Sequence, residues 1–107
     1  MQESGDMAKG LIVVLLGVVF SFAGNLLFFY DDSCGYCKIQ AEELVRNRDC
    51  VGQHRLYPIE INRDRAMAVR WGVSFVPTMF LVENGRYSKV EGVLLGRDLR
   101  RFLGCGQ

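Results

Sequence analysis

Two cysteines separated by two residues, Cys34-Gly-Tyr-Cys37, are the residues whose types and spacing most clearly indicate chemistry. An apolar run, Leu26 to Tyr30, precedes them, and a helical pattern begins at Cys34. A cysteine at a helix N-terminus lies near unpaired backbone N–H groups and the positive end of the helix dipole, which favour a thiolate. We therefore expect thiol–disulfide exchange, with Cys34 as the nucleophile and Cys37, one turn into the helix, as the buried resolving thiol.

The residues of this motif by themselves also allow other functions. One alternative is that the two cysteines form a permanent disulfide. Another is that they form half of a zinc site, although zinc normally takes four ligands and the chain has no second Cys-x-x-Cys motif. A peptide-binding or chaperone module with incidental cysteines is one alternative to an enzyme. A carrier that holds a soft metal ion between Cys34 and Cys37 is another. For the redox function we expect no metal and no organic cofactor, because the dithiol itself carries the electrons.

Composition limits the classes of protein to which the chain can belong. Its 107 residues suffice for one domain, and the 50% hydrophobic content excludes a disordered chain. Lys and Arg number 13 against 12 Asp and Glu, a net charge of +1. We therefore expect no nucleic-acid partner, because such binding depends on an excess of basic groups. A monomer is expected.

The N-terminal residues indicate export from the cytoplasm. An apolar run from Leu11 to Phe20 follows Lys9 and precedes the small-residue site Ser21-Phe-Ala23, which is typical of a secretory signal peptide. Translation from Met7 would give this segment a positively charged start. Read on to Tyr30, the run is also long enough for a membrane anchor, and a strand or helix of the folded domain is a third interpretation. We predict a signal peptide or N-terminal membrane anchor over residues 1–25, with any anchor through residues 11–23. The domain of residues 26–107 would then lie in the periplasm or outside the cell, where disulfides persist.

The rest of the chain predicts an α/β fold of order β-α-β-α-β-β-α. The expected strands are residues 26–30, 56–61, 79–83 and 87–93, and the expected helices are 34–47, 64–71 and 97–103. The first βαβ unit gives a parallel pair, and Asn84-Gly85 predicts a hairpin, so the four-stranded sheet is mixed. Helices should cover both faces of this sheet. Pro58 places its strand at an edge, since proline cannot donate to a strand ladder.

The first predicted helix has an apolar face at helical spacing. Cys37, Ala41, Leu44 and Val45 form this face. The polar side chains should mostly take the opposite, solvated side; they are Gln40, Glu42, Glu43, Arg46 and Arg48.

Two further cysteines follow the first and last predicted helices. Both helices should start at the same end of the sheet and lie on the same face, so Cys50 and Cys105 at their far ends become neighbours. A structural disulfide between them is geometrically plausible, and two unpaired thiols are the alternative. His54 is expected on an exposed loop with no assigned role.

These motifs together resemble the thioredoxin-fold disulfide oxidoreductases, in particular small bacterial extracytoplasmic thioredoxin-like proteins. The resemblance covers about residues 26–105 and rests on Phe28-Phe-Tyr-Asp-Asp-Ser-Cys-Gly-Tyr-Cys37, Trp71-Gly-Val-Ser-Phe-Val-Pro-Thr78, Phe80-Leu-Val-Glu-Asn-Gly85, and Gly92-Val-Leu-Leu-Gly with Asp98-Leu-Arg-Arg-Phe-Leu103. It implies a minimal thioredoxin-like fold and a mixed-disulfide mechanism on protein thiols and disulfides. It also implies a membrane or soluble redox partner that resets the dithiol.

The resemblance further implies a substrate-binding surface around the two cysteines. Pro77 would follow a cis peptide bond, and the backbone of Val76 would pair with an extended substrate segment. Gly92 would keep this surface open, and Tyr36 would lie on it. Trp71 is expected to pack in the core or a loop rather than to bind substrate.

Two positions depart from the family pattern. Phe28 stands where the cytoplasmic reductases of the family carry a buried acid, and Ser33 stands where thioredoxins usually carry tryptophan. Both departures argue against a fast general reductase, while the nucleophile is retained.

Overall fold

The computed structural model describes residues 12–15 and 18–106. The two short strands β1 (Ile12–Leu15) and β2 (Val18–Ser21) form an antiparallel sheet of their own. The elements that follow are β3 (Gly24–Tyr30), α2 (Gly35–Arg46), α3 (Arg48–Val51), β4 (His54–Glu60), α4 (Arg65–Arg70), β5 (Thr78–Glu83), β6 (Arg86–Glu91) and α5 (Gly96–Phe102). From β3 onward the predicted order is confirmed, with the short helix α3 as an addition after α2.

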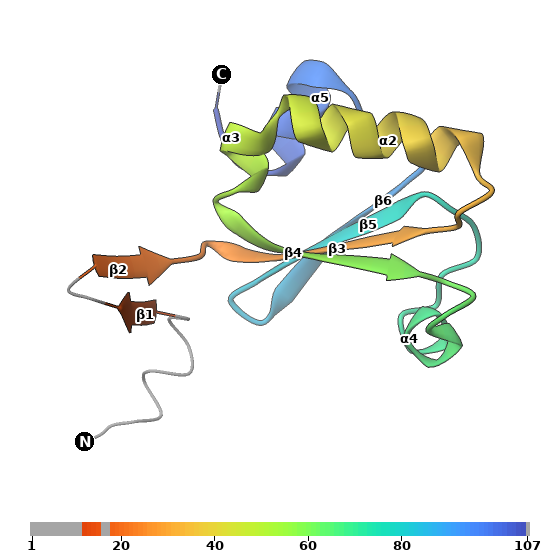
Figure 1. The fold of residues 1–107 in the computed structure, drawn as a ribbon, viewed down its shortest axis with the longest axis horizontal. Helices are drawn as coiled ribbons and strands as arrows, with labels where there is room; N and C mark the ends of the chain where they lie inside the picture. Colours follow the sequence, from red (N-terminus) through yellow and green to blue (C-terminus); the bar gives the residue numbers. More distant parts are fainter. Residues whose placement is uncertain (1–11, 16–17, 107) are drawn as a thin grey trace.

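The larger sheet has four strands in the order β4-β3-β5-β6. β3 pairs in parallel with β4 and antiparallel with β5, and β5 pairs antiparallel with β6. Helices α2, α3 and α5 lie over one face and α4 lies on the other, as Figure 1 shows. The mixed sheet with helices on both faces is therefore confirmed, and so is the edge position of β4, which contains Pro58.

The hairpin between β5 and β6 also forms where the residues predict it. Asn84 has φ 54° and Gly85 has φ 76°, so both turn residues adopt the left-handed region that a type I′ turn requires. The turn sets the register in which Glu83 pairs with Arg86.

The core has two layers because successive side chains of β3 point to opposite faces of the sheet. Leu26 and Phe28 belong to the layer under α2 and α5, and Leu27 and Phe29 belong to the layer over α4. All four are buried, as expected for a continuous apolar strand. Trp71 packs on Phe80 in the second layer, with ring centroids 4.8 Å apart, which confirms its packing role.

The prediction for the faces of α2 is wrong at three positions. Gln40 is 0% exposed and Glu43 is also buried, whereas Val45 is 60% exposed. The reason is that α2 contacts the segment before α5 as well as the sheet. Gln40 donates to the carbonyl of Leu94 and accepts from its N–H, at 3.0 and 2.7 Å, so both polar atoms of the buried amide have a partner.

The four-stranded sheet begins at Gly24, two residues before the predicted start of the domain. Of residues 1–25, for which a signal peptide or anchor is predicted, residues 1–11 and 16–17 lie outside the described residues, while 12–15 and 18–21 form β1 and β2. The signal peptide or anchor stays a prediction. Within the described ranges 12–15 and 18–106, no helix is both long enough and apolar enough to span a bilayer.

Candidate active site

Cys34 lies at the first turn of α2, directly before its first helical residue. It is the N-cap of the helix, with an extended backbone at φ −91° and ψ 116°. Its Sγ accepts a hydrogen bond from the backbone N–H of Cys37 at 3.0 Å. The sulfur therefore takes the role that an N-cap oxygen usually has, next to the N–H groups that favour an anion. The first turn of α2 carries no acidic side chain that would oppose this.

Cys37 is the buried member of the pair. The residue is 3% exposed, while Cys34 is half-buried. Burial raises the pKa of the Cys37 thiol from its ordinary 9.0 to about 12, and its hydrogen bond with Cys34 acts in the same direction. Both sulfurs are unbonded in the structure. At neutral pH Cys37 is therefore a thiol that needs a proton acceptor before it can attack.

An apolar groove lies beside Cys37. The groove has a volume of about 510 Å³ and is bordered by α2 and β4, with Cys37 and Phe28 among its lining residues. Phe28 is 5% exposed and packs in the core where the family's reductases place their acid. Cys37 therefore faces an apolar side chain at this position instead of a carboxylate.

The loop before β5 faces Cys34. The Val76–Pro77 peptide bond is cis, as the resemblance implies. The Sγ of Cys34 lies 4.0 Å from the carbonyl oxygen of Val76, and Pro77 is buried. The N–H of Gly92 donates to the carbonyl of Pro77 at 2.8 Å, so Gly92 is connected to the same surface.

The surroundings of this loop are open to solvent. Gly92 has φ 92°, a left-handed backbone that favours glycine, and a Cβ there would meet no heavy atom within 4 Å. Tyr36 is 69% exposed, and Phe75 is 54% exposed. The sequence analysis did not name Phe75 as part of this surface. Its position, an aromatic residue directly before Val76 and Pro77, could have indicated it.

The loop from Asp31 to Ser33 leads into Cys34. The backbone N–H and the hydroxyl of Ser33 both donate to Asp31 Oδ1, at 2.9 and 2.8 Å, and these bonds lower the pKa of the Asp31 carboxyl. The N–H of Cys34 donates to the carbonyl of Asp31 at 3.0 Å. Asp32 forms an ion pair with Arg63 from the loop after β4. The loop that leads into Cys34 is therefore held by several polar contacts.

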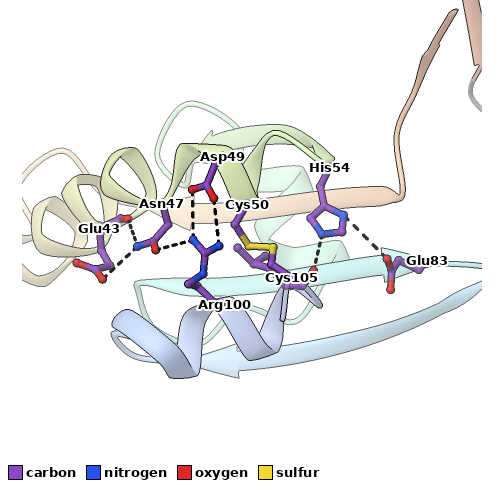
Figure 2. The surroundings of a disulfide bond; sticks show 9 residues. Glu43, Asn47, Asp49, Cys50, His54, Glu83, Arg100 and Cys105 are labelled. Carbon is purple, nitrogen blue, oxygen red and sulfur yellow. Dashed lines mark hydrogen bonds and ion pairs between the residues drawn. A yellow bond between two sulfur atoms is a disulfide. The ribbon is translucent and has the colours of Figure 1, made fainter. Parts of the chain in front are cut away.

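The second cysteine pair lies at the far end of the same helical layer. A disulfide joins Cys50 in α3 to Cys105 after α5, with the Cα atoms 5.7 Å apart (Figure 2). Cys50 is 0% exposed. Beside the disulfide, Arg100 donates to Asn47 Oδ1 and to both carboxylate oxygens of Asp49, at 3.0 to 3.2 Å. These contacts join α2, α3 and α5, which confirms that the far ends of the helices are neighbours.

The prediction that His54 lies on an exposed loop is wrong. It is the first residue of β4 and is 3% exposed, because β4 begins two residues before the apolar pattern suggests. Its Nε2–H donates to the carbonyl of Leu103 at 2.7 Å, and its Nδ1 lies 4.0 Å from a carboxylate oxygen of Glu83 (Figure 2).

Within residues 12–15 and 18–106, no group of three or more His, Cys, Asp and Glu side chains could hold a metal ion.

Comparison with known proteins agrees with this geometry. A family model described as a thioredoxin-like domain matches residues 24–105. A protein of Brevibacillus choshinensis named "Disulfide bond formation protein" is 32% identical over 82 residues, which cover 73% of this chain and 69% of the relative.

Solved structures show the same fold. A mutant thioredoxin from Halobacterium salinarum superposes with a TM-score of 0.66 and 26% identity, over 77% of this chain and 73% of that one. Thioredoxin-2 of the malaria parasite, titled a component of the parasite's protein secretion machinery, has a TM-score of 0.72 and 19% identity, over 97% of both chains.

The chain belongs to the thioredoxin-like family. Within that family it is a thiol–disulfide oxidoreductase.

Proposed function

We propose that the chain exchanges dithiol and disulfide with protein substrates through Cys34-Gly-Tyr-Cys37, by way of a mixed disulfide. The observation that carries the proposal is the position of Cys34 Sγ. It lies at the start of α2, accepts the Cys37 N–H at 3.0 Å, and lies 4.0 Å from the Val76 carbonyl. The nucleophile is thus next to backbone N–H groups and beside backbone that an extended segment could pair with.

In the reducing direction the reaction has two displacement steps. The Cys34 thiolate attacks one sulfur of a substrate disulfide, forms the Cys34–substrate bond, and releases the other substrate sulfur as a thiolate. Cys37 loses its proton, attacks Cys34 Sγ, and releases the second substrate sulfur, leaving a Cys34–Cys37 disulfide. Two electrons pass from the dithiol to the substrate. One of the two substrate thiols takes the proton of Cys37, and the other takes a proton from solvent. The departing substrate thiolate is the proposed acceptor for the Cys37 proton, because Phe28 supplies no base.

Substrates would bind along the loop opposite Cys34. The backbone of Val76 would pair with an extended segment, beside the surface formed by Pro77 and Gly92. Tyr36 and Phe75 would contribute exposed aromatic rings at the rim. Since main-chain pairing does not read side chains, a broad set of protein thiols and disulfides is the expected substrate class.

We place this activity outside the cytoplasm, in the periplasm or beyond, with residues 1–25 as a signal peptide or anchor. The disulfide between Cys50 and Cys105 supports an oxidising compartment. The name of the Brevibacillus choshinensis relative supports it as well. A membrane or soluble redox partner would return the dithiol to its starting state.

Single-cysteine variants test the proposal. Cys34→Ser should abolish insulin reduction, and Cys37→Ser should accumulate mixed disulfides visible by mass spectrometry, because the second displacement is lost. Cys50→Ser/Cys105→Ser is the matched control, assayed where circular dichroism shows it folded, and should keep its activity. Full insulin reduction by Cys34→Ser would refute the proposal. Peptide binding that persists unchanged in Cys34→Ser/Cys37→Ser, without any exchange activity in the unmodified protein, would instead indicate a binding module.

A further inference from the structure

Glu60, the last residue of β4, is a buried carboxylate outside the dithiol. The residue is 6% exposed, yet no cation within the described part of the chain pairs with it directly. Its Oε2 accepts from the N–H of Asp32 at 2.9 Å. Its Oε1 accepts from the N–H groups of Asn62 and Arg63, at 2.7 and 3.1 Å. The Nδ2 of Asn62 completes the set at 3.3 Å from Oε2. A buried charge is tolerated only when it is paired in this way.

These bonds connect two loops that are far apart in the sequence. Asp32 belongs to the loop between β3 and α2, whereas Asn62 and Arg63 belong to the loop between β4 and α4. Two more contacts join the same loops: Asn62 Nδ2 donates to Asp31 Oδ2 at 3.2 Å, and Arg63 pairs with Asp32. Glu60 is the buried centre of this set, because the other partners are exposed or half-buried.

The loop that Glu60 holds is directly joined to Cys34. Asp32 is two residues before Cys34, and the N–H of Cys34 is bonded to the carbonyl of Asp31. A shift of the Asp32 backbone would therefore move Cys34 Sγ relative to both the Cys37 N–H and the Val76 carbonyl. Displacements of about 1 Å can cost roughly 100-fold in rate when reacting atoms must be aligned.

The hydrogen bonds argue against a role for Glu60 as an acid or base. The backbone N–H of Asp32 and the other donors lower the pKa of the Glu60 carboxyl, so the group stays ionised and acts as an acceptor near neutral pH. Each of its oxygens already accepts two hydrogen bonds from the protein. Neither sulfur of the dithiol is among its partners.

We propose that Glu60 is a positioning residue that holds the Asp31–Ser33 loop and thereby keeps Cys34 Sγ at the start of α2, opposite Val76. The inference rests on the proposed function of the dithiol and names a residue on which its alignment depends. Glu60 acts through the backbone of Asp32 and does not touch the reacting atoms.

Comparing Glu60→Ala with Glu60→Gln separates the effect of holding the Asp31–Ser33 loop from the effect of the negative charge of Glu60. Both remove the negative charge, but glutamine keeps one acceptor oxygen for the loop. We expect kcat/KM for insulin and the rate of Cys34 alkylation by iodoacetamide to fall roughly 100-fold in Glu60→Ala. Both rates should stay within roughly tenfold of the unmodified protein in Glu60→Gln. Glu42→Ala, an exposed carboxylate on α2, is the charge-matched control and should leave both rates unchanged.

Asn62→Ala provides a second variant, should removal of Glu60 prevent folding. Asn62 is exposed, and its side chain donates to Glu60 and Asp31, so both rates should fall by a smaller factor in a folded protein. Equal or faster alkylation in Glu60→Ala and Glu60→Gln alike would overturn the proposal, and so would unchanged rates in a folded Asn62→Ala. A reduced protein that reduces no insulin, but whose Cys34 alkylation still depends on Glu60, would overturn the proposed function alone.

Discussion

The two cysteine pairs occupy opposite ends of one helical layer and differ in almost every physical respect. Cys34 and Cys37 lie at the N-terminus of α2, unbonded, with one sulfur half-buried and the other buried. Cys50 and Cys105 lie beyond the C-termini of α2 and α5 and are bonded, with Cys50 fully buried. In the proposed function the same side chain therefore serves exchange at one end, and it forms a cross-link at the other.

Loop length and local backbone account for the difference. The Cys50–Cys105 bond spans a sequence separation of 55 residues, so it restricts the unfolded chain strongly. A bond between Cys34 and Cys37 would restrict the unfolded chain less, since only two residues separate them. Conversely, Cys34 lies among the free N–H groups at the start of α2. A disulfide for stability and a dithiol for exchange therefore need different places in the same fold.

The largest expected effect comes from removing the bonded pair. Cys50→Ala/Cys105→Ala should lose about 4 kcal/mol of unfolding free energy, because the unfolded chain gains the entropy of an open loop. Cys34→Ala/Cys37→Ala should change stability far less. Urea unfolding at low temperature without reductant measures both. Equal losses in the two double variants would contradict the division of roles.

A substitution at Gln40 tests whether a contact in the middle of α2 affects the Cys34–Cys37 end of the helical layer without affecting the Cys50–Cys105 end. Its side chain pairs with both backbone groups of Leu94, two residues after Gly92, so Gln40→Ala leaves the N–H and the carbonyl of the half-buried Leu94 without these partners. We expect a loss of roughly 2 kcal/mol and an increased KM for insulin, with the Cys50–Cys105 bond still resistant to reductant. Glu42→Ala on the exposed face of α2 is the control, with a change within about 0.5 kcal/mol. An unchanged KM would show that this contact serves stability alone.

The smallest expected effect is a pH dependence confined to the exchanging pair. The folded protein raises the pKa of Cys37 from 9.0 to about 12, so the neutral thiol is favoured by folding. This contribution to stability is complete below pH 9 and is lost as pH rises toward 12. Between pH 9 and about pH 10 the reduced protein should therefore lose at most about 1.4 kcal/mol more stability than Cys37→Ser. Parallel curves for the two proteins would contradict the assignment of Cys37 as the desolvated thiol.

Local patterns in the sequence were enough to predict much of the fold and the chemical centre. The alternation along β3, the Asn84-Gly85 turn and the edge position of Pro58 follow from backbone geometry within a few residues. Cys34 and Cys37 could be recognised because their spacing places them on the first turn of a helix after a buried strand. These features depend on neighbours in the chain, which a sequence displays directly.

Only the tertiary structure determined the roles of the buried polar side chains. Gln40 and Glu43 look solvated by helical periodicity, and His54 looks like a loop residue, yet each is buried against a backbone group from a distant segment. Glu60 shows no motif at all, and its importance comes from the Asp32 N–H, 28 residues away. Periodicity reports which side of an element a residue lies on, whereas a buried hydrogen bond depends on which segments the fold brings within about 3 Å.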